Sequence, residues 1–257
     1  MIRGLYTSGW SMLANSRKMD VITNNLANVN TNAYKKDGVV FESFPELLTQ
    51  RIKDTDGNAA IGNMSLGNDV GEIFTYNNAG QFQKTSNNLD FALSDTGNGV
   101  SYFAVGVAQA NGNTQEFYTR DGAFTLDSSG RLVNKDGNLV LGQNGAITLS
   151  GEDFSVTSDG KVYQGANLVD TLKVVTFTNP ETLRKVGNNL MSTTAQSTQA
   201  PFTGEIKQGY IEQSNVNVVK EMVDMISVSR AYEANQKALQ AQDGTLEKAV
   251  NEIGSIK

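Results

Sequence analysis

Residues 216–256 read VNVVKEMVDMISVSRAYEANQKALQAQDGTLEKAVNEIGSI and contain no proline. Apolar side chains recur there at every seventh position: Val218, Met225, Tyr232, Leu239, Leu246 and Ile253. The line of residues between them is mixed: Met222, Ser229, Gln236, Asp243 and Val250. Six matches at one heptad position predict a single amphipathic helix, about 60 Å long at a rise of about 1.5 Å per residue.

The other end of the chain carries a shorter version of the same pattern. Between Ile2 and Asn28, a segment without proline, apolar residues again lie seven apart: Leu5, Met12, Met19 and Leu26. Residues 1–36 hold five bases and one acid, whereas residues 205–257 hold six bases and eight acids. Opposite charges and a repeat of 3.5 residues favour a coiled coil between the two terminal helices. The alternative is that each helix covers a globular core with its apolar face.

The middle of the chain, residues 70–190, is rich in β-branched and aromatic residues separated by Asp-Gly, Asn-Gly and Ser-Gly pairs. Such runs predict an all-β domain. Residues 124–133 (FTLDSSGRLV) and 154–163 (FSVTSDGKVY) resemble each other and predict two similar hairpins, with Gly130 and Gly160 at their turns. The expected fold class is therefore α+β, with paired terminal helices and a central β domain.

These patterns divide the chain into five parts. They are an N-terminal helix with an Asn-rich end (1–36), a connector (37–69), the β domain (70–190), a linker (191–214) and the C-terminal helix (215–257). Within the first connector, Phe41 to Ile52 is expected to form a short helix, with Pro45 in its first turn. Residues 54–69 and 187–204 show no sustained period and are expected to be flexible.

Composition excludes several kinds of chemistry. The 257 residues include no histidine and no cysteine, so histidine- and thiol-based catalysis and ordinary zinc sites are ruled out. Carboxylates remain, but Asp121, Asp127, Asp136 and Asp159 all lie in turn-like contexts, where aspartate bonds its own backbone. We therefore expect no enzyme activity, no cofactor and no metal.

Charge and hydropathy restrict the partners. The net charge of −6 argues against nucleic acid. No run approaches the roughly 18 apolar residues of a membrane span, so direct insertion into a membrane is not expected. The first ten residues mix Tyr, Thr, Ser and Gly where a signal peptide needs an apolar run, so any export should proceed without a cleaved signal.

One segment is unusually rich in asparagine. Residues 24–36 read NNLANVNTNAYKK, and they include Asn24, Asn25 and Asn28. Asparagine favours caps and turns, which accounts for the end of a helix but not for this density. Asn215 and Asn217 form a similar cluster where the last helix begins, and there a side-chain amide can cap backbone donors.

This Asn-rich segment resembles the N-terminal signature of bacterial flagellar rod and hook proteins, N-N-L-A-N-x-x-T-x-(G/A)-(F/Y)-(K/R), and every position is met. Residues 209–226 (GYIEQSNVNVVKEMVDMI) and 230–238 (RAYEANQKA) are similar to the C-terminal signature of the same family. Together with residues 119–130 (TRDGAFTLDSSG), the resemblance spans nearly the whole chain. Length, the start Met1-Ile-Arg and residues 230–233 favour the distal-rod type over the longer hook protein, with the proximal-rod paralogue as a close rival.

The resemblance implies an architecture and a role. Family members place their paired terminal helices in the inner layer of an axial tube and a β domain in the outer layer. The implied function is a self-assembling subunit of the basal-body rod, exported by the flagellar type III apparatus, with other rod proteins and the hook protein as partners. Two alternatives stay open: a hook or hook-associated subunit, and a secreted carboxylate-dependent protein that acts on or binds glycans.

From the heptads and the signatures we expect an assembly interface along both helices. Its residues are Leu5, Met12, Met19, Leu26, Asn24, Asn25, Asn28, Asn215, Val218, Met225, Tyr232, Leu239, Leu246 and Ile253.

Overall fold

The computed structural model describes residues 2–51, 59–65, 67–97, 99–108, 114–151, 153–187 and 189–253; side chains are described for these apart from 2–3, 49–51, 59–61 and 252–253. The chain forms two compact units. The smaller unit contains Met1–Ala27, Asp37–Phe74 and Asn217–Lys257, and the larger contains Asn28–Lys36 and Thr75–Val216. The Asn-rich residues 28–36, which we grouped with the first helix, thus belong with the β strands.

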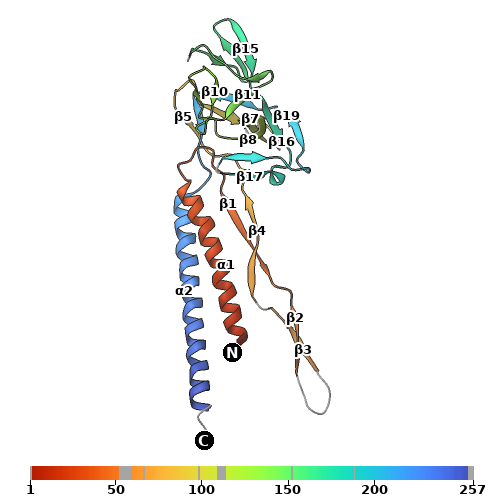
Figure 1. The fold of residues 1–257 in the computed structure, drawn as a ribbon, viewed down its shortest axis with the longest axis vertical. Coiled ribbons are helices and arrows are strands. Elements are labelled where there is room, and N and C mark those ends of the chain that lie inside the picture. Colours follow the sequence, from red (N-terminus) through yellow and green to blue (C-terminus); the bar gives the residue numbers. More distant parts are fainter. Residues whose placement is uncertain are drawn as a thin grey trace. The chain divides into compact units, whose positions relative to one another are not determined.

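Two long helices dominate the smaller unit (Figure 1). Helix α1 spans Ile2–Ala27 and helix α2 spans Val218–Lys248, followed by one π turn, Ala249–Ile253. The side chain of Asn217 caps α2 by accepting a hydrogen bond from the Lys220 amide at 3.0 Å. Both long helices are confirmed, while residues 254–256 of the expected C-terminal helix lie outside the described part of the chain.

The two helices lie side by side and run antiparallel. The Cα of Gly4, near the start of α1, faces the side chain of Gln242 near the end of α2. The approach is so close that a Cβ added to Gly4 would lie 2.6 Å from Gln242 Nε2. At the other end of α1, Asn25 donates to the Glu221 carboxylate in the first turn of α2. These two contacts fix which residues face each other along the pair.

The expected helix from Phe41 to Ile52 is wrong, because this segment forms strands; its last residue is outside the described range. Strand β1 (Asp37–Ser43) pairs with β4 (Asn68–Thr75), and β2 (Leu47–Arg51) pairs with β3 (Ala59–Met64). Val39, Val40 and Phe41 favour extended backbone, and Pro45 lies between strands, where no ladder hydrogen bond is lost. Of the connector expected to be flexible, 54–69, residues 59–64 and 68–69 thus lie in strands, and 54–58 and 66 fall outside the described part.

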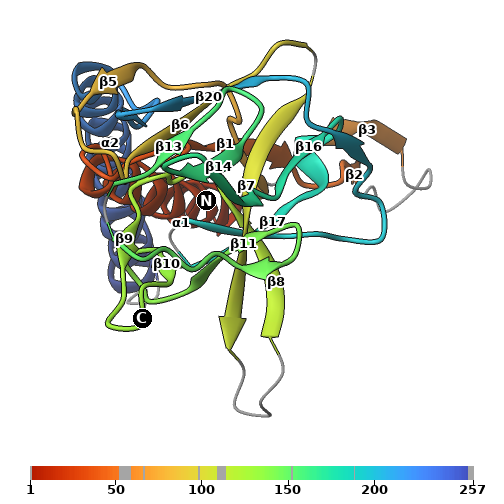
Figure 2. The ribbon, with the colours of Figure 1, turned by 90° about the horizontal axis from the view of Figure 1, so that it is seen from above.

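The larger unit is built on a ten-stranded antiparallel sheet, in which β7 lies between β8 and β11 (Figure 2). The described strands of the larger unit, inside and outside this sheet, are β5 (Phe82–Lys84), β6 (Phe91–Ser94), β7 (Val100–Ala108), β8 (Thr114–Thr119), β9 (Thr125–Leu126), β10 (Leu132–Val133), β11 (Leu139–Gly142), β12 (Gly145–Ala146), β13 (Ser155–Val156), β14 (Lys161–Gln164), β15 (Asn167–Thr171), β16 (Val174–Phe177), β17 (Arg184–Val186), β18 (Leu190–Ser192), β19 (Gln199–Pro201), β20 (Glu205–Gln208) and β21 (Tyr210–Glu212). A 3₁₀ turn lies at Pro180–Thr182. The pairs β5–β21 and β6–β20 and the three strands β13–β15 form separate small sheets.

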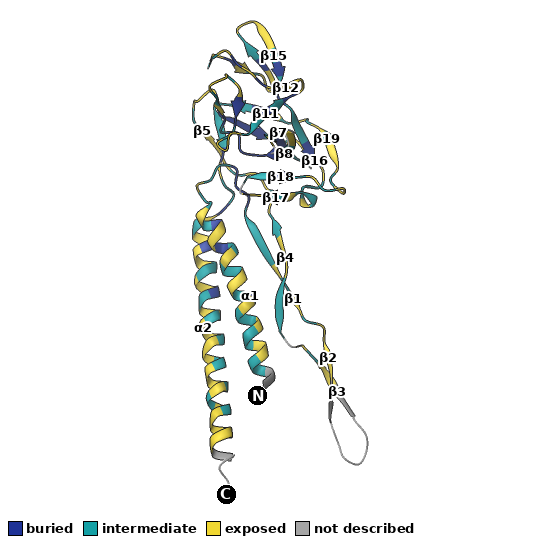
Figure 3. Ribbon diagram, viewed as in Figure 1, coloured by how far each residue is buried: buried dark blue, intermediate teal, exposed yellow. Residues whose placement is uncertain are grey.

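An aromatic cluster fills the core of the larger unit. Phe91, Phe103 and Phe124 are buried, and the ring centroids of Phe103 and Phe124 lie 5.2 Å apart in an edge-to-face arrangement. Figure 3 shows the contrast with the helices, whose residues are mostly half-buried or exposed. Most of the buried apolar surface therefore belongs to the β strands, as the sequence pattern predicts.

The two similar hairpins are confirmed. Strand β9 pairs with β10, and β13 pairs with β14, both antiparallel. Gly130 and Gly160 lie in the turns with φ of 75° and 87°, a region that glycine enters without steric cost.

Other expectations for the middle of the chain need correction. The linker expected at 191–214 contains strands β19, β20 and β21, which pair with β16, β6 and β5. Short strands of this kind are held by backbone hydrogen bonds and need no apolar period. Residues 147–149 form no strand, and Thr148 makes a single bridge with Arg131.

Candidate functional site

Asn25 joins three parts of the smaller unit. Its side chain is 1% exposed, its Oδ1 accepts from the backbone nitrogen of Asp37 at 2.9 Å, and its Nδ2 donates to the Asp37 carbonyl at 2.9 Å. The same Nδ2 donates to Glu221 Oε2 at 3.2 Å. One amide thus fixes the start of β1 and the start of α2 to the end of α1, which only Asn or Gln could do with a single donor–acceptor group.

Glu221 is a buried acid in the first turn of α2. Its carboxylate lies at the end of the helix where backbone N–H groups create a partial positive charge, which favours an anion. Because Asn25 also donates to it, the acid is not left uncompensated on burial.

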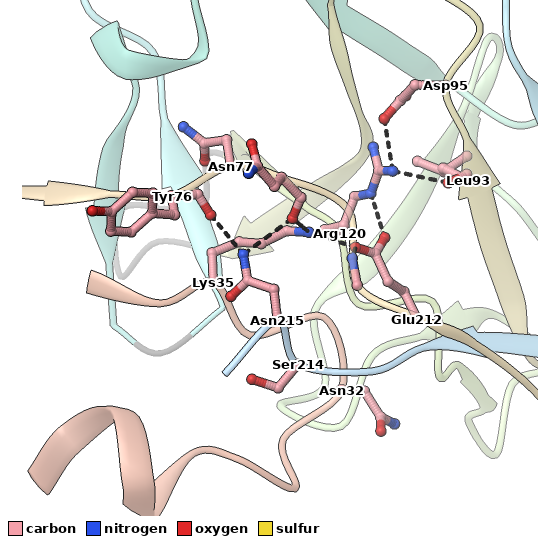
Figure 4. A network of polar contacts seen from close by, with 12 residues as sticks. Asn32, Lys35, Tyr76, Asn77, Leu93, Asp95, Arg120, Glu212, Ser214 and Asn215 are labelled. Atoms are coloured by element: carbon pink, nitrogen blue, oxygen red, sulfur yellow. Dashed lines mark hydrogen bonds and ion pairs between the residues drawn. The ribbon is translucent and has the colours of Figure 1, made fainter. Parts of the chain in front are cut away.

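Asn215 plays the corresponding part in the larger unit (Figure 4). Its Oδ1 accepts from the Lys36 amide at 2.8 Å, and its Nδ2 donates to the carbonyls of Tyr76 at 2.8 Å and Asn78 at 3.1 Å. Its own amide donates to the Tyr34 carbonyl. The Asn-rich segment and the segment before α2 are thus joined by one asparagine.

Next to Asn215 lies a buried network of charges, which we call the ion cluster: Lys35, Asp95, Arg120 and Glu212 (Figure 4). Glu212 binds both cations, pairing with the Lys35 ammonium through Oε1 and with Arg120 Nε through Oε2 at 2.6 Å. Arg120 also pairs with Asp95 at 2.8 Å. The side chains of Lys35, Arg120 and Glu212 are at most 2% exposed, so their charges are compensated inside the protein.

Backbone groups complete the ion cluster. Arg120 donates to the carbonyls of Ser101 at 2.6 Å and Leu93 at 2.8 Å, and Lys35 donates to the Asn78 carbonyl at 2.8 Å. The Gly80 amide donates to Glu212 Oε1 at 2.7 Å. The cluster therefore connects the N-terminal signature, strands β6 to β8 and the C-terminal signature.

Burial acts differently on the two cations. Burial lowers the pKa of Lys35, although Glu212 opposes the shift. For Arg120, burial also acts to lower the pKa, but Glu212 and Asp95 outweigh it and the pKa is raised. Arginine thus keeps its charge here more firmly than lysine does, as its higher intrinsic pKa favours.

The predicted seam residues all lie on the helices, and they are half-buried in the single chain: Leu5, Met12, Met19, Leu26, Val218, Met225, Tyr232, Leu239 and Leu246. Asn28 is half-buried and Asn24 is exposed. Ile253 ends the π turn, and its side chain lies outside the described set.

The second line of the α2 seam differs from the one read in the sequence. Met222, Gln236, Asp243 and Val250 are exposed, and only Ser229 of that line is half-buried. The covered line lies one residue earlier and comprises Glu221, Val228, Asn235, Gln242 and Ala249. A polar residue can occupy this line because a partner such as Asn25 satisfies it, so a search for apolar residues alone misses it.

Apolar residues remain exposed on both helices, and one of them, Trp10, also packs edge-to-face against Phe44 with ring centroids 4.9 Å apart. The α1 stripe consists of Tyr6, Trp10 and Leu13, exposed by 59%, 38% and 42%. The α2 stripe consists of Val219, Met222, Val223 and Ile226, exposed by 71%, 48%, 56% and 54%. Residues three and four apart share a helix face, so each set forms a continuous strip.

No group of three or more acidic, histidine or cysteine residues that could hold a metal occurs within the described part. No described helix is long and apolar enough to cross a membrane. Asp121 is buried in a turn, where burial raises its pKa and its carboxylate accepts from the Ala123 amide and from Asn189 Nδ2.

Sequence reasoning identified Asn25 and Asn215 but missed the charged residues they accompany. Lys35, Arg120, Glu212 and Glu221 look like ordinary surface charges in the sequence. The available signal was their position: all four lie within the quoted segments 24–36, 119–130 and 209–226.

Comparisons with known proteins match the segments that carry these residues. Three family descriptions match: "Flagella basal body rod protein" at residues 5–35, "Flagellar hook protein FlgE/F/G D1 domain" at 96–164 and "Flagellar basal body rod FlgEFG protein C-terminal" at 207–252. The matched ranges contain Asn25, Lys35, Arg120, Glu212 and Glu221. The site therefore lies where the family descriptions apply.

Full-length relatives extend the match. The flagellar basal-body rod protein FlgG of Buchnera aphidicola subsp. Acyrthosiphon pisum is 34% identical over 96% of this chain and 98% of its own length. FlgG of Bacillus subtilis is 34% identical, covering 98% of this chain and 99% of its own length. The rod protein FlgF of Caulobacter vibrioides is 33% identical over the whole of both chains. The chain is thus a structural protein of the flagellar axis. It belongs to the flagellar basal-body rod protein family.

Proposed function

We propose that this chain polymerises in the flagellar basal body as a rod subunit of the distal type and forms part of the shaft that transmits torque from motor to hook. It acts as a structural protein and not as an enzyme. Its partners are further copies, other rod proteins and the hook protein, and it reaches them through the flagellar export apparatus without a cleaved signal.

The observation that carries this proposal is the apolar surface on both terminal helices. The α1 and α2 stripes leave seven large apolar side chains between 38% and 71% exposed in the single chain. Burial is worth about 25 cal/mol for each Å² of apolar surface removed from water, so neighbouring copies gain free energy by covering these stripes. A protein that works alone has no comparable reason to expose them.

The helix pair supports the coiled-coil part of the proposal. The two contacts that join the helices lie 21 residues apart on each, from 4 to 25 on α1 and from 242 to 221 on α2. Because 21 residues are three heptads, the residues of each helix that face the other stay on the same side of the helix over this length, as in a left-handed coiled coil. We propose that Leu5, Met12, Met19 and Leu26 and the heptad line of α2 line this seam and its contacts with neighbouring copies.

Electron microscopy of basal bodies from a strain that lacks this gene tests the proposed function. Loss of hook and filament with a truncated rod remaining supports a rod subunit, and the length of the remaining rod tells a distal from a proximal position. A complete rod that lacks only the hook would favour the hook-subunit alternative. Intact motile flagella would contradict the proposal unless a paralogue is found in the rod.

Charged substitutions in the seam should block polymerisation. Leu26→Asp or Leu239→Asp places a carboxylate at a half-buried position that assembly covers further, and burying an unpaired charge is strongly unfavourable. We expect neither variant to enter basal bodies, while the circular dichroism of the β strands is unchanged. The control is Gln240→Asp, an exposed neighbour on α2, which should assemble. Incorporation of either seam variant at the wild-type level would contradict the assigned interface.

Asp121 separates the structural from the carboxylate-enzyme alternative. Because its pKa is raised in the folded state above the ordinary carboxyl value of 3.8, folding favours its protonated form. This acid should therefore cost stability increasingly as the pH rises through its raised pKa, and the loss should be absent at lower pH. Asp121→Asn should remove this pH dependence and leave the stability at pH 7 equal or higher, measured by denaturant unfolding.

Retained function of the same variant completes the test. The asparagine that the substitution introduces has nearly the same size and keeps one oxygen that can accept from Asn189 Nδ2, which also donates to the Asn32 carbonyl at 3.2 Å. Motility of the Asp121→Asn strain should equal that of the wild type. Loss of motility with an intact fold would instead point to carboxylate chemistry.

A further inference from the structure

The two stripes lie at different levels along the helix pair. Counting from the contact between 4 and 242, residue 10 of α1 lies level with residue 236 of α2 in the same chain. The α2 stripe, however, is centred near residue 222, which is 14 residues before 236. At about 1.5 Å per residue, the two stripes are displaced from each other by about 21 Å along the helix axis. Within one chain they cannot cover each other.

We propose that the α1 stripe of one copy packs onto the α2 stripe of a second copy, and that the two copies are offset by about 21 Å along the helix axis. This inference rests on the proposed function and specifies which surfaces of the polymer meet.

The dimensions of the stripes match. Tyr6, Trp10 and Leu13 span two helical turns, and the α2 stripe from Val219 to Ile226 spans the same length. In an antiparallel contact Tyr6 lies opposite Ile226, Trp10 opposite Met222 and Leu13 opposite Val219. Large aromatic side chains on one helix thus meet branched aliphatic and methionine side chains on the other, a combination common in interface cores.

Charges beyond the stripes select the antiparallel direction. In a parallel contact with the same apolar overlap, exposed Asp20 would face exposed Glu233. Arg17, which also pairs with Asp69 at 2.8 Å, would face Arg230. Like charges facing each other across a helix contact are destabilising. In the antiparallel contact neither pair meets, because residues 17 and 20 extend past the start of α2.

In a polymer of this chain, the α1 of one copy and the α2 of the next also run antiparallel. Since α1 and α2 are antiparallel within each chain, copies that all point the same way bring the α1 of one antiparallel to the α2 of the next. The contact joins two different surfaces with an axial offset, so it does not close into a dimer. Repeated, it generates an open helical assembly.

Cysteine crosslinking tests the offset directly, because the chain has no cysteine of its own. Trp10→Cys and Met222→Cys chains are expressed together in a strain that lacks the native gene, and isolated basal bodies are oxidised. Disulfide-linked peptides are then identified by mass spectrometry. The matched control replaces Met222→Cys with Gln236→Cys, an exposed position on the same face of α2 that is level with residue 10 without an offset.

The expected result is a link between positions 10 and 222 that is about tenfold more abundant than the link between 10 and 236, since a disulfide requires Cα atoms about 4.4–6.8 Å apart. If a cysteine at 10 or 222 prevents incorporation, Leu13→Cys with Val219→Cys tests the same register, with Glu233→Cys as the control.

The outcomes separate this inference from the proposed function. Basal bodies that contain the chain but show the 10–236 link, or no 10–222 link, overturn the offset and leave the rod assignment intact. Absence of the wild-type chain from basal bodies overturns the rod assignment and the offset with it.

Discussion

Replacing Glu212 with glutamine is expected to lower the free energy of unfolding of the larger unit by about 3–5 kcal/mol. Glutamine has nearly the same size and still accepts from the Gly80 amide, so packing is kept. What is lost is the negative charge that Lys35 and Arg120 share while both are at most 2% exposed. Asp95 still pairs with Arg120, which leaves Lys35 as the uncompensated buried cation.

Hydrogen exchange of the full chain measures this effect where it arises. We expect faster exchange of amides in β5, β6 and β8, together with a lower denaturant midpoint. Glu205→Gln is the matched control, because Glu205 is an exposed acid on β20 and its change should alter stability by no more than about 0.5 kcal/mol.

A second substitution separates charge from packing. The double variant Lys35→Met with Glu212→Gln removes both members of the pair and leaves Arg120 paired with Asp95. Because the unpaired cation is gone, the double variant should be more stable than Glu212→Gln alone, by at least about 1 kcal/mol. Simple additivity of the two losses would show that the ion cluster is not stabilised by charge compensation.

The helices could be predicted from the sequence because their signal is local and periodic. The spacing of Leu239 and its heptad neighbours is enough to predict a helix, and the observed α2 begins at Val218, directly after its cap residue Asn217. The two hairpins were predictable for the same reason, since Gly130 and Gly160 mark turns between short alternating runs.

The site could be predicted only in part, because its partners are far apart in the chain. The density of asparagine was evident, yet nothing local shows that Asn25 bonds residue 221 or that Asn215 bonds residue 36. Lys35, Arg120 and Glu212 are separated by about 90 residues each, and a buried charge has the same letters as an exposed one. Strand β21 escaped notice because Tyr210–Glu212 is too short to show a period.

Gly80→Ala is expected to destabilise the larger unit by about 3 kcal/mol, the upper part of the range for overpacking. A Cβ at this position would lie 1.9 Å from the Gln213 carbonyl oxygen and 3.0 Å from its carbon. Both are backbone atoms next to Glu212, and the Gln213 amide is held by the Gln81 carbonyl at 2.8 Å. The clash therefore cannot be relieved by turning a side chain, and the segment that carries Glu212 has to move.

The movement should be visible in the ion cluster. Because the Gly80 amide also donates to Glu212 Oε1, a shift of this segment weakens the binding of both cations. The control is Gly151→Ala, which meets no described atom within 4 Å and should unfold at the wild-type denaturant concentration. If Gly80→Ala matches that control, the close approach of residues 80 and 213 does not constrain the fold. If adding Glu212→Gln to Gly80→Ala causes no further loss of stability, the glycine acts through Glu212, since the effects of coupled neighbours are not additive.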